Sequence, residues 1–137
     1  MSQYFDIGDQ TLWNPSNGVA RLFMNQVALY EAEVGLPSGI GPMKADECQI
    51  DPIAFTAFVD ALLAWRSETR HAVMVTLSEG FVATVLALAG RANIEVNWQA
   101  AQSAESRCLK MTSDPHAEKW TAALQQKTRE LDRHMAA

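Results

Sequence analysis

The stretch HAVMVTLSEGFVATVLALAG, residues 71–90, decides the fold. Its apolar side chains recur at three- and four-residue steps, which predicts a helix with one apolar face formed by Val73, Leu77, Phe81, Val85 and Leu88. The second half of the stretch has little polar surface on any side. A helix of this kind is buried centrally or at a subunit interface. We expect it to be the central helix, with a subunit interface as the alternative.

Two more helices are predicted before this stretch. Asn14 or Ser16 can cap a first helix, which Gly35 ends. Its single apolar stripe consists of Val19, Leu22, Phe23, Val27, Tyr30 and Val34. Asp51, followed by a proline, begins a second helix that ends near Ser67.

The chain after the central helix is harder to interpret. Residues 93–113 are expected to form a poorly defined connector, in which Ile94, Val96 and Trp98 alternate with polar residues and indicate a short strand. An aspartate followed by a proline then begins a last helix over 114–136. Its apolar stripe is thin, so we expect it to pack on the surface of the domain or against a second subunit.

Short strands are predicted near the N-terminus. Residues 4–13 are typical of a hairpin that turns at Gly8 and Asp9. Pairing about this turn sets Ile7 opposite Gln10, Phe5 opposite Leu12, and Tyr4 opposite Trp13. Residues 44–50 are a candidate third strand. The expected fold class is therefore α+β, with about four helices and a small antiparallel sheet.

The size and composition of the chain favour one folded domain. It has 137 residues, of which 48% are hydrophobic and 20% are charged, so we expect residues 1–137 to form a single domain. The first residues lack the basic lead and apolar run of a signal peptide. The longest run of small and apolar residues, 81–90, is too short to cross a bilayer. We expect a cytoplasmic protein without a membrane span.

The net charge of −5 is unevenly distributed along the chain. Residues 1–69 carry nine acidic and three basic side chains, whereas the remainder carries seven acidic and eight basic ones. Nucleic-acid binding requires a basic patch that displaces counterions. In the last helix the basic residues stand among acidic ones, so no nucleic-acid partner is expected.

Four segments carry a resemblance: LWNPSNGVARLF (12–23), GPMKADECQID (41–51), AFVDALLA (57–64) and EGFVATVLAL (79–88). Together they resemble a family of small actinobacterial proteins, common in Streptomyces-type genomes, that is known only as a domain of unknown function. The resemblance covers roughly residues 1–92. It implies a bacterial cytoplasmic protein, and it implies no activity.

Three carboxylates within six residues, those of Asp46, Glu47 and Asp51, form what we call the acidic segment. Such a group can bind a cation, do acid–base work or meet a partner with a basic face. The alternative is that Asp51 caps a helix while Asp46 and Glu47 are solvated. Calcium is not expected, because no Asp-x-Asp-x-Asp-Gly loop is present.

Few residues support catalysis. His71 and Glu79 lie two helical turns apart and form a weak general-base candidate, against which stands a helix-terminal histidine and a surface glutamate. No histidine or cysteine pair has metal-ligand spacing, so neither a metal site nor a cofactor is expected. Cys48 and Cys108 are expected to be reduced thiols, and the acids beside Cys48 disfavour its thiolate.

The corner between the hairpin and the first helix offers a candidate ligand pocket. Trp13, Asn14 and Arg21 there combine aromatic and polar groups, as sites for small ligands do. The alternative is that Trp13 and Asn14 only pack against and cap the helix.

Three functions are consistent with these patterns. The first is a non-enzymatic protein-binding module, such as an inhibitor, an immunity-like protein or a regulator, that uses the acidic segment against a partner with a basic face. The second is a small enzyme or small-molecule-binding protein of bacterial specialised metabolism. The third is a structural assembly subunit, in which the third or fourth helix forms a homodimer interface.

Overall fold

The computed structural model describes residues 2–69, 71–96, 98 and 115–137, with only the backbone described for 115–118. It confirms the α+β fold class. The elements are β1 (Tyr4–Ile7), β2 (Gln10–Trp13), α1 (Asn17–Val34), β3 (Glu47–Gln49), α2 (Pro52–Glu68), α3 (Ala72–Arg91) and α5 (Pro115–His134).

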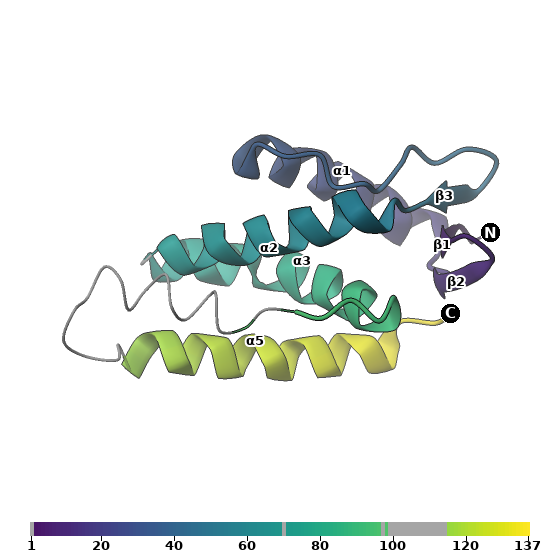
Figure 1. The fold of residues 1–137 in the computed structure, drawn as a ribbon. Coiled ribbons are helices and arrows are strands. Elements are labelled where there is room, and N and C mark those ends of the chain that lie inside the picture. The colour runs from purple at the N-terminus through teal and green to yellow at the C-terminus, as the bar shows by residue number, and fades with distance from the viewer. Residues whose placement is uncertain (1, 70, 97, 99–114) are drawn as a thin grey trace.

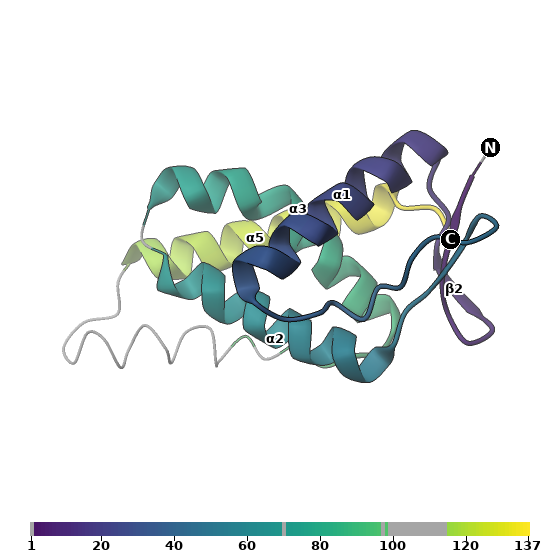
Figure 2. The same cartoon turned by 90° about the horizontal axis from the view of Figure 1, so that it is seen from above.

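The helices form three layers, with the sheet at one end (Figure 1). α2 and α3 make the middle layer, α1 lies on one side of it, and α5 lies on the other side and packs mainly on α3. Seen from above, α1 crosses over α3, and both ends of the chain lie near the sheet (Figure 2).

α3 is the central helix that residues 71–90 predict, but only in its second half. From Phe81 to Ala89 every residue except Thr84 is buried. Val73 and Leu77, which were expected to continue the buried face, are exposed. α3 is long and apolar enough to cross a membrane, with a mean hydropathy of 1.9 over its most apolar stretch. However, 56% of that stretch is buried inside the protein, and the core helices of soluble proteins can be equally long and apolar.

The predicted helix boundaries are confirmed. The hydroxyl of Ser16 accepts a hydrogen bond from the Val19 N–H at 3.4 Å, and Gly35 ends α1 in the left-handed region with φ 80°. The Asp51 carboxylate accepts a hydrogen bond from the Ile53 N–H at 3.0 Å and so caps α2.

The hairpin turns at Gly8 as predicted, but its register changes after two pairs. Ile7 pairs with Gln10 and Asp6 with Thr11, and then a register shift sets Phe5 opposite Trp13 rather than Leu12. A bulge places two residues of one strand against one of the other. As a result Phe5, Leu12 and Trp13 are all buried.

The sheet is mixed, not purely antiparallel, and its strand order is β2-β1-β3. β3 pairs with β1 in parallel, with Phe5 opposite Cys48. The reason is a tight turn directly before β3, in which Lys44 and Glu47 exchange backbone hydrogen bonds of 2.8 and 2.9 Å. This turn reverses the chain, so that β3 runs in the direction of β1.

The strand indicated by Ile94, Val96 and Trp98 is not formed. Residues 94–96 have no regular structure, and the three apolar side chains pack partly buried against the core. Most of the predicted 93–113 connector, including Cys108, lies outside the described residues.

The core contains a chain of aromatic rings that links the sheet to α1 and α3. Phe5 stacks on Trp13 at 5.3 Å between ring centres, and Trp13 meets Phe23 edge-on at 5.3 Å. Phe23 in turn stacks on Phe81 at 5.7 Å, and Tyr30 stacks on Phe81 at 4.3 Å. Phe81 therefore holds α1 on α3.

Replacement of Phe81 by Ala should lower the free energy of unfolding by roughly 3–5 kcal/mol, because the ring is only 3% exposed. Val73→Ala on the exposed face of the same helix should change it by less than about 0.5 kcal/mol. Chemical denaturation measures both. A Phe81→Ala protein that stays equally stable, but shifts from dimer to monomer in sedimentation, would contradict the core role.

Candidate binding groove

A groove of about 600 Å³ lies between the first half of α1, the middle of α3 and the second half of α5. Figure 2 shows where α1 crosses α3 with α5 behind them. The lining residues are mostly apolar: Trp13, Asn14, Pro15, Ser16, Val19, Leu22, Phe23, Gln26, Leu77, Gly80, Phe81, Thr84, Lys127, Leu131, His134, Met135 and Ala136.

The groove has a buried aromatic floor and exposed aliphatic walls. Trp13, Phe23 and Phe81 on the floor are buried. Leu22 on α1 is 62% exposed and Leu77 on α3 is 76% exposed. The walls therefore stand in solvent, and the groove is open.

The polar groups of the groove are few and lie mainly on α5 and at the start of α1. Lys127 and His134 line the α5 side, and none of the lining residues is acidic. On α3 the hydroxyl of Thr84 donates to the Gly80 carbonyl at 2.8 Å. Because this hydroxyl is already bonded within the helix, Thr84 contributes mainly its methyl group to the α3 side of the groove.

Arg91, at the end of α3, holds α5 and the sheet in place. Its guanidinium donates to the Leu12 carbonyl at 2.7 Å and to the Asp132 carbonyl at 2.9 Å, and also to the Met135 carbonyl. It forms an ion pair with the Asp132 carboxylate at 2.7 Å. In the sequence, the only signal for this role of Arg91 is a basic residue in the last turn of an apolar helix.

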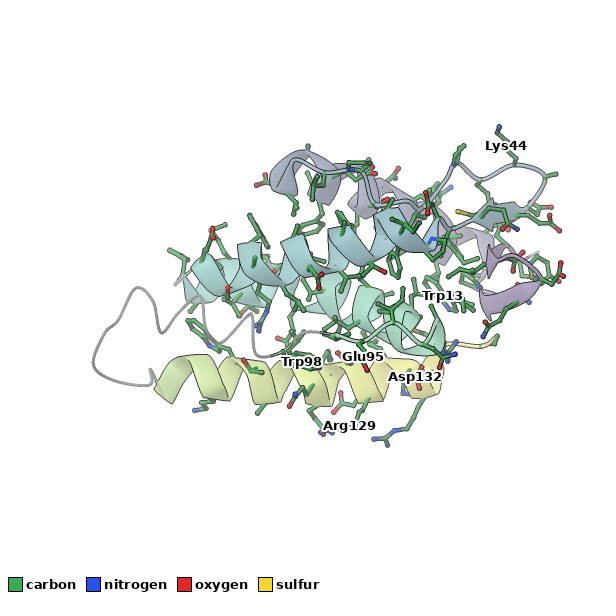
Figure 3. All side chains as sticks on the ribbon, in the orientation of Figure 1. Trp13, Lys44, Glu95, Trp98, Arg129 and Asp132 are labelled. Atoms are coloured by element: carbon green, nitrogen blue, oxygen red, sulfur yellow. The ribbon has the colours of Figure 1, made fainter. Side chains whose placement is uncertain are left out.

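The structure brings together two of the three residues of the candidate ligand pocket. Trp13 and Asn14 both line the groove, and the Asn14 N–H donates to the Ala136 carbonyl at 2.7 Å. The Asn14 side-chain oxygen is buried and has no hydrogen-bond partner among the described residues. Arg21 is exposed and does not line the groove. Figure 3 shows Trp13 between the helices and the sheet.

The acidic segment is exposed and does not line the groove. Asp51 serves as the cap of α2. Asp46 and its neighbour Ala45 occupy the left-handed region, with φ 65° and 50°, as the two central residues of the turn before β3. The turn directs this end of the sheet into solvent, and Lys44 projects outward beside it (Figure 3).

His71 and Glu79 lie outside the groove. His71 is the exposed residue before α3, and Glu79 is half-buried on α3. Helical geometry places Glu79 about 200° around the helix from Leu77, on the side away from the groove wall. Among the described residues, no group of three histidine, cysteine or acidic side chains is placed to hold a metal ion.

Cys48 is a free, fully buried thiol. Burial, followed by the charge of Asp6, raises the pKa of Cys48 to about 11. Its S–H donates to the Gly41 carbonyl at 2.8 Å. The thiolate is disfavoured as predicted, although burial is the larger cause rather than the acids beside it in the sequence.

The comparison with known proteins shows the family of the chain. Residues 1–137 match the family described as "Family of unknown function (DUF6086)". The chain belongs to this family. The match covers the whole chain, whereas the four sequence segments indicated a family of unknown function over residues 1–92 only. No curated protein and no solved structure matches the chain.

Loss of the Arg91 side chain should release α5 from the sheet. Arg91→Met removes hydrogen bonds of a charged donor and should lower the free energy of unfolding by roughly 1.5–3 kcal/mol. Amide hydrogen exchange should accelerate mainly in the second half of α5. Arg129→Met is the control, because Arg129 bonds Gln126 within α5 and points away from α3 (Figure 3). Equal effects of the two variants would contradict the role of Arg91.

Proposed function

We propose that this DUF6086 chain is a non-enzymatic protein-binding domain, and that the groove is its main contact surface. The observation that carries this proposal is the exposure of Leu22 on the α1 side of the groove and of Leu77 on the α3 side. Apolar side chains gathered on one surface commonly mark an interaction site. Val19 and Val73 are also exposed on these helices and extend the apolar surface.

The shape of the groove supports a protein partner more than a substrate. A substrate pocket encloses most of its ligand and brings polar groups together at one point. Here the aliphatic walls stand in solvent, and neither His71 nor Glu79 lines the groove. A protein partner can cover such walls with a complementary apolar surface.

The acidic segment supplies the second part of the proposal. Asp46 and Glu47 are exposed at one end of the sheet, away from the groove lining. Exposed charges mainly accelerate the encounter with a partner of opposite sign. We propose a partner with a basic face at this point, a cytoplasmic setting, and no cofactor, nucleic acid or membrane in the interaction.

Small-molecule binding is a second candidate function. The groove volume of about 600 Å³ falls in the range of ligand sites, and its floor is aromatic. A homodimer through α3 or α5 stays a prediction, which the exposed Val73 and Met74 on α3 favour.

Replacement of Leu22 and Leu77 by Ser should abolish capture of the partner from a native extract without loss of folding, because both side chains are largely exposed. Ile53→Ser is the matched control, since Ile53 is 83% exposed at the start of α2 and does not line the groove. Cross-linking with mass spectrometry measures the capture of the partner, and thermal melting measures whether the variant is folded. Retention of the same partners by the double variant would reject the groove as the contact surface.

Neutralisation of the acidic segment should slow association with the captured partner at low salt and leave the melting temperature nearly unchanged. Asp46→Asn with Glu47→Gln is preferable to charge reversal, because asparagine tolerates the positive φ of Asp46. Asp51→Ala serves as a stability control and should cost about 1 kcal/mol through the lost cap. An association rate that is unchanged at low salt would leave Asp46 and Glu47 as solvated surface charges.

A further inference from the structure

We infer that the groove accepts an amphipathic α-helix of the partner, with acidic side chains two helical turns apart on the edge that faces α5. This inference rests on the proposed function, because it names the segment that a protein partner inserts. Three observations lead to it: the helical walls of the groove, the missing side chain at Gly80, and the placement of Lys127 and His134.

The walls favour a helix over an extended segment. Leu22, Leu77 and Leu131 project from three helices, whose backbone groups are already bonded within each helix. A β-strand peptide satisfies its N–H and C=O groups by pairing along a free sheet edge, whereas Trp13 is the only strand residue among the described residues that line the groove. A helix satisfies these groups internally and needs only apolar contact with the walls.

Gly80 provides the space for close approach. A glycine inside a helix is destabilising relative to alanine, because it loses more conformational freedom on folding. At Gly80 neither a positive φ nor a crowded neighbour requires glycine, since an added Cβ would meet no atom within 4 Å from the other described parts of the protein, the nearby backbone of α3 aside. Its structural consequence is a hollow in the α3 wall, which permits the backbone of a second helix to come near.

The Lys127 ammonium and the His134 imidazole, which can donate a hydrogen bond through a ring N–H, specify the edge of the incoming helix. Lys127 and His134 line the groove seven residues apart, which is about 10 Å or two helical turns. The Lys127 ammonium lies 3.8 Å from Glu130, and both side chains are about half exposed, so this ion pair is weak. With no acidic residue in the lining, an acidic edge on the partner complements the α5 side.

Selection from a display library of short helical peptides tests the inference directly. Binders to the full chain should carry apolar residues at i, i+3, i+4 and i+7, and acidic residues seven apart on one flank. Gly80→Trp fills the hollow and should weaken the selected peptides at least about tenfold. Gly90→Trp is the matched control, because Gly90 is exposed, equally uncrowded and outside the groove. Leu77→Asp is a second blocking variant at an exposed site.

Charge reversal completes the test. Lys127→Glu with His134→Glu should select peptides with basic residues at the same two positions. Peptides that bind in the groove but are extended, or show no acidic preference, overturn the inference and leave the proposed function standing. Failure to select any peptide sensitive to Gly80→Trp overturns the inference. Two further results also overturn it. If the chain binds dodecanoate and Gly80→Trp abolishes that binding, the occupant of the groove is a small amphiphile. If the chain is a dimer that Gly80→Trp dissociates, the occupant is a second copy of the chain.

Discussion

The four contacts of the Arg91 guanidinium connect parts of the chain that are far apart in sequence. One contact reaches β2 at Leu12, two reach Asp132, and one reaches Met135 at the end of α5. Because α5 contributes one side of the groove, the groove exists only while this helix is held against α3. A charged donor suits this position, because the last carbonyls of a helix have no partner within the helix.

The uneven burial of α3 explains why the domain has a groove. Its second half is covered on almost all sides, whereas Val73, Met74 and Leu77 in the first half remain exposed. α1 crosses over α3 at Phe81 and then diverges from it (Figure 2). Two crossing helices separate on either side of their contact point, and the space on one side of this crossing is the groove.

The groove and the turn before β3 differ in chemistry. The groove is apolar, with a lysine and a histidine on its α5 side, while the turn before β3 presents Asp46 and Glu47 to solvent. An apolar contact surface contributes affinity, and exposed charges contribute mainly to the rate of encounter. A protein-binding domain can use both, and neither arrangement requires the buried polar network of an enzyme.

The sequence by itself determined the helices, their caps and the buried half of α3, because these depend on local periodicity and on residues such as Ser16, Gly35 and Asp51. It also grouped Trp13 and Asn14, which both line the groove, with Arg21, which does not. Only the tertiary structure decided the bulge at Phe5, the parallel pairing of β3 and the role of Arg91. It likewise decided that Leu22 and Leu77 would be exposed, although both belong to regular apolar stripes. The periodicity of a sequence shows which side of a helix is apolar. How much of that side is buried depends on where the neighbouring helices cross it, and only the tertiary structure determines this.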